Sequence, residues 1–267
     1  MSQENFTNPT WLTRLQEAGY PNFESWWNTE VSLVEKGNFR GSDDNSSWSH
    51  VSRISLPSGE TLYLKRQQNH YPNNILLKLL RNLTFQIEWK NYQALKNAGI
   101  PTLNIIHFAN RKHNGNRQCI IVSEELKGMT PIGDLIDWYN KNQWPPRSQR
   151  LAMLTPIVKM IRKMHDAGIT HNALYKRHIY LNIPIHQDSP VMPDHFQTCL
   201  IDLERAKFPG ANSSKLITHD LEKMFRRIDW PAKDCLWFLK QYLGIDRLTP
   251  QAKVITRKIA ATRKNKS

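Results

Sequence analysis

A lysine and an aspartate, each placed where a strand-like run ends, could give this sequence its chemistry. Lys65 lies near the end of the run TLYLKR, and Asp202 closes the apolar run in CLIDLERA. A lysine in that place can reach phosphate oxygens, and a carboxylate can bind Mg²⁺ together with phosphate and water. Taken alone, either residue is more often a solvated surface group or part of a turn. Their interpretation therefore depends on the rest of the chain.

A third stretch, HNALYKRH, runs from His171 to His178, between a helix-like segment and an apolar run. Its spacing is that of a kinase catalytic loop, which is written H-R-D-L-x-x-x-N. His171 and Leu174 fit the pattern. Ala173 stands where the catalytic aspartate belongs, and His178 stands where the asparagine belongs. Alanine cannot accept a proton, so the loop has the pattern without its usual base.

These features occur in the order that a kinase fold requires. Lys65 lies on a strand, and Glu88 on the following helix is its expected ion-pair partner. A hinge-like strand end, an amphipathic helix, the HNALYKRH loop and Asp202 then follow. Several weak features in one fixed order are much less expected by chance than any one of them.

The elements that must position these residues follow from periodicity and turn composition. The pattern predicts strands first and helices afterwards, which favours an α+β fold of two lobes. The predicted domains are an N-terminal extension, 1–40, a β-rich lobe, 41–127, and a helical lobe, 128–267, with a basic tail. The main predicted elements are the hairpin strands His50–Leu56 and Thr61–Arg66, a helix over Asn74–Ala98, the strands Leu103–Ala109 and Gln118–Ser123, and a helix over Leu151–Ala167. A short helix around Trp11–Ala18 is also expected, with Asn8 or Thr10 as its cap.

The composition limits the class of protein. The chain has 267 residues and is 39% hydrophobic, which suits a folded protein with a sizeable core. Three scattered cysteines form no CxxC pair, so neither a disulfide framework nor a zinc site is indicated. No secretory signal and no apolar run near the ~20 residues of a membrane span is visible, so a cytoplasmic protein is expected.

The formal net charge of +14 predicts an anionic partner. Nucleic acid is the usual partner of a basic protein, but the sequence contains no Cys/His finger, RNA-recognition motif or leucine zipper. We therefore rank nucleic-acid binding last. An anionic membrane surface and a phosphorylated substrate remain as alternatives.

The chain resembles the lipopolysaccharide kinase family, the Kdo/WaaP and InaA-type proteins, which are similar to protein kinases. The stretches that carry the resemblance are TLYLKRQ, EWKNYQALKNAGIPT, MHDAGITHNALYKRHIYL, LIDLERA and HDLEKMFR. The resemblance covers roughly Val51 to Ile228. The resemblance implies a two-lobed fold that transfers phosphate from ATP with Mg²⁺ to a sugar of the lipopolysaccharide core. It also implies an anionic glycolipid as substrate and a place at the cytoplasmic face of the inner membrane, with peripheral lipid contact.

The resemblance also implies a role for each site residue. Lys65 and Glu88 match the ion pair that positions the ATP phosphates, and Glu124 to Leu126 match the hinge that contacts adenine through its backbone. Asp202 matches the metal-binding aspartate, and His178 stands at the second metal position. Asp220 resembles the helix aspartate that braces the catalytic loop.

Two departures from the family pattern leave the activity open. Ala173 replaces the catalytic aspartate, and the phosphate-covering segment DDNSSWSHV, with Ser46, Ser47 and Trp48, lacks the glycine motif. General base catalysis contributes ~10²–10⁴-fold, and positioning carries much of phosphoryl transfer. Other candidates for the missing role are His171, Asn172, His178 and Glu204. The leading interpretation is a kinase, and the alternative is a pseudokinase that binds nucleotide or a partner without turnover.

Overall fold

The structure is a computed structural model that describes residues 5–30, 40–41, 46–72, 82–208, 214–226 and 230–264. The chain divides into two compact units. The first unit comprises the residues up to Lys90 together with Leu103–Leu126, and the second comprises Asn91–Thr102 together with the residues from Lys127 onward. The domain boundaries that the sequence predicts after residues 40 and 127 stay predictions.

An antiparallel sheet with strands of different lengths forms the centre of the first unit. Among the described residues it has six strands in the order β1-β5-β6-β4-β3-β2. The strands are β1 Asn5–Thr7, β2 Arg40–Gly41, β3 Trp48–Ser55, β4 Thr61–Gln68, β5 Ile105–His113 and β6 Asn116–Glu124. The predicted β3–β4 hairpin is present and turns between Leu56 and Glu60, where Gly59 takes a positive φ of 90° that suits glycine. The predicted turn RKHNGNR is shorter than expected, because only Asn114 and Gly115 leave the two strands.

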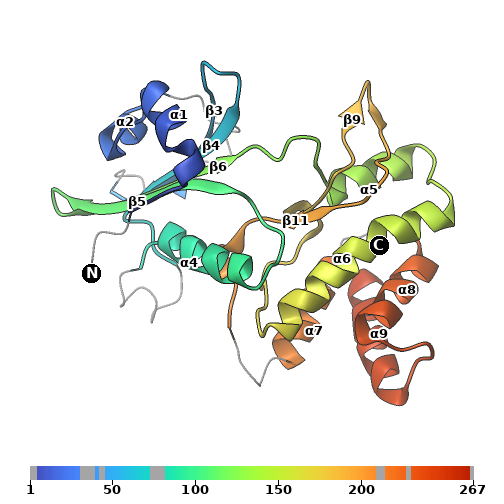
Figure 1. Ribbon diagram of the computed structural model, residues 1–267. Coiled ribbons are helices and arrows are strands. Elements are labelled where there is room, and N and C mark those ends of the chain that lie inside the picture. Colours follow the sequence, from blue (N-terminus) through green and yellow to red (C-terminus); the bar gives the residue numbers. More distant parts are fainter. Residues whose placement is uncertain are drawn as a thin grey trace. The chain divides into compact units, whose positions relative to one another are not determined.

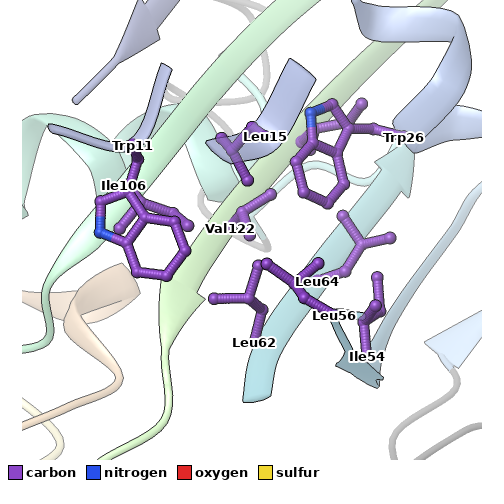
Figure 2. Close-up of a cluster of buried hydrophobic side chains, with 10 residues drawn as sticks. Trp11, Leu15, Trp26, Ile54, Leu56, Leu62, Leu64, Ile106 and Val122 are labelled. Atoms are coloured by element: carbon purple, nitrogen blue, oxygen red, sulfur yellow. The ribbon is translucent and has the colours of Figure 1, made fainter. Parts of the chain in front are cut away.

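The N-terminal segment packs on one face of this sheet, as Figure 1 shows for α1 (Leu12–Glu17) and α2 (Phe23–Trp27). The segment begins with β1 and a 3-10 turn, Pro9–Trp11, whose cap is Asn8. Its large apolar side chains contact every second residue of the central strands, as the period of two in a strand requires (Figure 2). The cluster consists of Trp11, Leu15, Trp26, Ile54, Leu56, Leu62, Leu64, Ile106, Ile120 and Val122.

Arg66 of β4 fastens the end of α2 to the sheet. Its Nη1 donates to the carbonyl oxygens of Trp27 at 2.6 Å, Thr29 at 2.9 Å and Trp26 at 3.3 Å. Its Nε donates to Nε2 of His50 at 2.9 Å, and Arg66 is only 7% exposed. A buried guanidinium needs such partners, so Arg66 and the three carbonyls satisfy one another.

Helix α4 is Thr84–Asn97, and its first half, up to Lys90, packs on the opposite face of the sheet, where Trp89 stacks on Phe108 (Figure 1). Gln67 of β4 fixes its first turn, because its Oε1 accepts from Thr84 Oγ1 at 2.7 Å and from the Phe85 amide at 3.3 Å. The predicted helix began at Asn74. Residues 73–81 lie outside the described part, but residues 82–83 are described and are not helical, so the helix begins later than predicted.

The second unit is mainly helical. Its helices are α5 Ile132–Lys141, α6 Arg147–Asp166, α7 Ser214–Phe225, α8 Ala232–Leu243 and α9 Pro250–Lys264. Its short strands are β7 Thr130–Pro131, β8 Ile179–Leu181, β9 Ile185–His186, β10 Ser189–Pro190 and β11 Thr198–Leu200, and β11, β8 and β7 form one small sheet. Asp234 at the start of α8 is fully buried and accepts from Arg150 at 2.6 Å and from Arg147 at 3.1 Å, both on α6. This buried carboxylate joins the two helices.

Candidate functional site

Lys65 and Glu88 form the ion pair that the sequence predicted. Lys65 points to the α4 face of the sheet, because β4 alternates and Leu64 belongs to the opposite face. Its Nζ lies 2.6 Å from Oε1 of Glu88. The side chains are 17% and 5% exposed, so the carboxylate is buried while the ammonium keeps some access to solvent. Glu88 therefore holds the Lys65 ammonium in place, and part of the ammonium remains accessible to solvent.

The predicted hinge lies at the end of β6. The Glu124 amide donates to the Asn104 carbonyl at 3.0 Å, and its carboxylate accepts from the Asn104 side chain. The next amide, of Glu125, donates to Thr61 at 3.1 Å. The adenine contact that the resemblance implies at Glu124 to Leu126 stays a prediction.

Part of the predicted phosphate-covering segment can be described. Trp48 starts β3, and its ring stacks on His50 at a centroid distance of 4.9 Å. Ser47 donates through Oγ to the Asn69 carbonyl at 3.0 Å, and the Ser46 carbonyl accepts from the Asn69 side chain. The preceding residues 43–45 lie outside the described residues.

In the second unit, Asp220 of α7 braces the HNALYKRH loop. Its Oδ2 accepts from the His171 amide at 2.6 Å, and its Oδ1 accepts from the Asn172 amide at 2.7 Å. His165 Nε2 lies 3.4 Å from Oδ2, and the Asp220 side chain is fully buried. Asn172 has a φ of 58°, and the two hydrogen bonds from the loop amides to Asp220 help to hold this conformation. The prediction that this aspartate braces the loop agrees with these contacts.

The His171 ring is also fully buried, and its Nε2 lies 2.9 Å from the Ile201 carbonyl. A carbonyl only accepts, so Nε2 carries the proton. Burial lowers the pKa of His171, although Asp220 opposes this shift, so the ring is neutral near pH 7. Such a ring suits positioning of the loop better than proton transfer to a substrate.

His178 and Asp202 are brought together. Nε2 of His178 lies 3.0 Å from Oδ2 of Asp202, but this contact is not a simple ion pair. Nδ1 of His178 is 2.8 Å from the Ala173 carbonyl and must donate, while Nε2 accepts from Arg177 Nε at 2.9 Å. Burial lowers the pKa of His178 to about 4, against the opposing charge of Asp202. The single lone pair of the neutral ring therefore accepts from Arg177, beside the Asp202 carboxylate.

A cation could bind to these two acceptors in place of the Arg177 donor. Ligands on adjacent corners of an Mg²⁺ octahedron, with bonds of ~2.1 Å, lie about 3.0 Å apart. The separation of His178 Nε2 and Asp202 Oδ2 has this value. The carboxylate suits Mg²⁺ well, whereas imidazole is more usual for Zn²⁺, Cu²⁺ or Fe²⁺. Within the described residues no group of three or more His, Cys, Asp or Glu side chains is placed to hold a metal ion.

The backbone around Asp202 is also specific. The sequence predicted that Asp202 ends the strand, but β11 ends at Leu200, two residues earlier. Asp202 adopts a left-handed conformation, φ 62° and ψ 63°, before the 3-10 turn Leu203–Arg205. Asn91 of α4 donates to the Leu203 carbonyl at 2.7 Å and to the Ala206 carbonyl at 3.3 Å. The Asp202 side chain is 35% exposed, so it remains accessible to a ligand.

Ala173 is 3% exposed, and its carbonyl accepts from the Tyr175 amide at 2.8 Å. Glu204, another candidate base, lies 3.7 Å from Arg205 Nε. Two contacts of the loop were missed by the sequence analysis, those of Arg177 with His178 and of Lys223 with the Asn172 carbonyl. Lys223 could have been found, because it lies three residues after Asp220 on the same helix face.

Together, the β-rich first unit and the helical second unit define a protein-kinase-like, two-lobed α+β fold. A solved structure of "WaaP in complex with acyl carrier protein" has this fold, with a TM-score of 0.69 and 19% sequence identity, and the match covers 99% of this chain and 100% of that one. The predicted fold class is thereby confirmed.

The sequence comparisons identify the family. A sequence model of the lipopolysaccharide kinase (Kdo/WaaP) family matches residues 24–242. The chain therefore belongs to this family, as predicted. It is similar to the protein InaA of Escherichia coli K12, with 27% identity over 214 residues, which cover 79% of this chain and 90% of InaA. It is also similar to the lipopolysaccharide core heptose(I) kinase WaaP of Pseudomonas aeruginosa, with 30% identity over 173 residues, which cover 63% of each. No helix within the described residues is long and apolar enough to cross a membrane.

Proposed function

We propose that this protein is an ATP- and Mg²⁺-dependent phosphotransferase that acts on a sugar of the lipopolysaccharide core. Family membership supports this class of reaction, and curated relatives named as lipopolysaccharide core heptose(I) kinases support the substrate. The observation that carries the proposal is the 2.6 Å contact between Lys65 and Glu88. A lysine held in this way in the second half of β4 is suited to position ATP phosphates.

The nucleotide-binding roles follow from the contacts in each unit. Lys65 would contact the phosphates, and Glu88 would keep its ammonium in place. Glu124 and Leu126 would contact adenine through their backbone. Asp202 would bind Mg²⁺ directly, with His178 Nε2 as a second ligand or as an acceptor for a metal-bound water. When bound, the metal ion would neutralise charge on the phosphates.

The HNALYKRH loop would position the acceptor. Asp220 holds the amides of His171 and Asn172, so the backbone of the loop does not depend on the side chain at residue 173. The Asn172 side chain is the group that we propose to orient the acceptor hydroxyl. We propose His171 as a positioning residue, since its ring is buried and neutral. Glu204 is the remaining carboxylate near Asp202 that could accept a proton.

One observation favours a second function. Ala173 removes the usual base, and this favours a pseudokinase that binds nucleotide without turnover. Loss of a general base typically lowers a rate by ~10²–10⁴-fold and need not affect nucleotide binding. The two functions thus make the same prediction for binding and different predictions for transfer.

The test is thermal unfolding with Mg²⁺ and ATP, compared with ATP plus a chelator. A ligand at a hundredfold excess over its dissociation constant stabilises the folded protein by ~2.7 kcal/mol. We expect a higher melting temperature for the native protein, no shift for Asp202→Asn, and an unchanged shift for the exposed control Asp194→Asn. A native protein without a shift at millimolar nucleotide would contradict both functions.

Transfer to purified lipopolysaccharide core then separates the two functions. The kinase predicts incorporation of the ATP γ-phosphate by the native protein, and the pseudokinase predicts none. Ala173→Asp should keep the Mg²⁺–ATP shift, and if residue 173 alone limits transfer, it should raise the rate. A flat rate with intact binding would indicate another base or a non-catalytic role.

We also propose peripheral association with anionic lipid at the cytoplasmic face of the inner membrane, through α9. Lys253, Arg257 and Lys258 are exposed on this helix beside Val254, which is 52% exposed, and residues 250–267 contain no acidic residue. Each basic residue near such a surface contributes ~1 kcal/mol. Charge reversal of these three residues should abolish sedimentation with phosphatidylglycerol vesicles at low salt. Binding that persists in this variant, or that does not weaken with salt, would refute the role of α9.

A further inference from the structure

Four basic side chains gather beside the HNALYKRH loop in the second unit. We name them the basic cluster: Arg205, Lys207, Lys223 and Arg226. The segment after Asp202 carries the first two, and α7 or its C-terminal end carries the others. None of the functions considered so far uses this cluster.

Backbone contacts fix the cluster next to the loop. The Thr170 amide donates to the Lys207 carbonyl at 2.9 Å, and the Lys207 amide donates to the Thr170 carbonyl at 2.8 Å. Thr170 directly precedes His171, so Lys207 lies at the entrance of the loop. The Arg226 amide donates to the Glu222 carbonyl at 2.9 Å, which continues α7 and keeps Arg226 on the helix three residues after Lys223.

Lys223 connects the cluster to the loop itself. Its Nζ donates to the Asn172 carbonyl and lies 5.8 Å from the centre of the Tyr175 ring. Burial lowers the pKa of Lys223, and the charges of Arg205, Lys207 and Arg226 lower it further, while Asp220 opposes the shift. Each of the other three cations is therefore close enough to Lys223 to repel its charge.

Three carboxylates lie near the four cations in the sequence or the structure. Asp220 is fully buried and accepts from two amides of the loop. Glu204 lies 3.7 Å from Arg205, and Glu222 lies 3.9 Å from His219. Arg205, Lys207 and Arg226 are exposed, so an anion from solvent could reach them. Such an anion would relieve the repulsion between Lys223 and the other three cations.

We propose that the basic cluster binds an anionic group, a phosphate or a carboxylate, on the sugar acceptor, and so holds the acceptor at the loop. This inference rests on the proposed function and adds to it the recognition of charge on the acceptor. The guanidinium groups of the cluster are suited to this task, because arginine binds such oxyanions through two parallel hydrogen bonds.

The test measures binding of deacylated, water-soluble lipopolysaccharide core oligosaccharide by calorimetry, with and without its phosphate groups. The cluster variant replaces three exposed members and keeps Lys223, which contacts the loop. The control variant removes the same charge from exposed positions elsewhere in the second unit. The cluster variant is Arg205→Gln, Lys207→Gln and Arg226→Gln, and the control is Lys141→Gln, Lys159→Gln and Lys233→Gln.

We expect about tenfold weaker binding by the cluster variant, since each of three exposed ion pairs contributes roughly twofold to threefold. The control should bind as the native protein does, and the Mg²⁺–ATP thermal shift should persist in both variants. Loss of affinity when the phosphates are removed would identify phosphate as the bound group, and no loss would identify carboxylate. Either result, with the cluster dependence, supports the proposal.

Three results would overturn it. The first is equal affinity of the cluster variant and the native protein. The second is cluster-dependent binding of inorganic phosphate that is as tight as binding of the oligosaccharide, which would indicate a site for free phosphate. The third is cluster-dependent binding of phosphatidylglycerol vesicles without any effect on the oligosaccharide. Failure of the proposed function is distinct, because it would remove the Mg²⁺–ATP shift and leave cluster-dependent oligosaccharide binding intact.

Discussion

The ion pair of Lys65 and Glu88 gives the sharpest prediction about the first unit. The changes are Lys65→Met, Glu88→Gln and the combination of both, which remove one charge, the other, or the pair. Both replacements keep nearly the size of the native side chain. Differences in stability therefore report mainly on charge.

The expected magnitude follows from the geometry. Unit charges 2.6 Å apart attract each other by about 6 kcal/mol at an effective dielectric constant of ~20, but removing both groups from water offsets most of this energy. Breaking a buried pair by changing one partner costs ~3–5 kcal/mol. Because the Lys65 side chain keeps 17% exposure, we expect about 2 kcal/mol for each single variant. For the double variant we expect about 2 kcal/mol as well, which gives a coupling energy of about 2 kcal/mol.

Urea denaturation of the four proteins measures the coupling, and the Mg²⁺–ATP thermal shift measures the functional effect. We expect both single variants to lose the shift, Lys65→Met because the phosphate contact is gone, and Glu88→Gln because the ammonium is no longer held. A coupling energy below about 0.5 kcal/mol would refute the argument that the pair is buried and rigid. A normal thermal shift in Lys65→Met would refute its contact with phosphate.

Three further predictions concern stability, measured by urea denaturation. Asp220→Asn should destabilise the protein by about 2–4 kcal/mol, because an amide cannot accept both loop N–H groups as a carboxylate does, whereas the exposed Asp166→Asn should change stability by less than about 0.5 kcal/mol. Arg66→Met should cost about 2–3 kcal/mol by leaving three carbonyls without their donor, and an equal loss in the exposed Arg53→Met would contradict this reason. Burial lowers the pKa of His107 from 6.5 to about 4, so as pH falls the unfolded chain protonates this histidine before the folded protein does. The free energy of unfolding should therefore fall by up to about 3 kcal/mol as pH drops from 6.5 to 4. His107→Gln should reduce that pH dependence, and an unchanged slope would show that His107 does not cause it.

The sequence predicted the fold class and several local elements because each had a strong local signal. The β3–β4 hairpin has alternating residues around a PSGE turn, and α6 has a clear helical period. Lys65 and Glu88 were paired from a kinase pattern, and the structure brings them together. The predicted roles of the site residues go beyond geometry and stay predictions.

Other features had no local signal. The short strands β1 and β2 form only by pairing with distant strands, and the packing of the N-terminal segment depends on partners such as Leu62 and Val122. Arg66 looked like an ordinary charged residue on a strand, and only the tertiary structure shows the carbonyls that it contacts. Likewise, the protonation state of His178 follows from the Ala173 carbonyl and Arg177, which periodicity cannot reveal.

The conformation of the HNALYKRH loop bears on the question of activity that Ala173 raises. If the loop no longer bound ligands, the hydrogen bonds that hold its backbone would be expected to be incomplete. Instead, Asp220 accepts from two loop amides, His171 contacts the Ile201 carbonyl, and His178 lies 3.0 Å from Asp202. Each of these side chains is costly to bury without its partners. A loop with all of these contacts favours a site that still binds its ligands. Residue 173 is then a single position that can be replaced while the other contacts of the loop remain. Transfer activity, and not the fold, is therefore the property that Ala173→Asp can change.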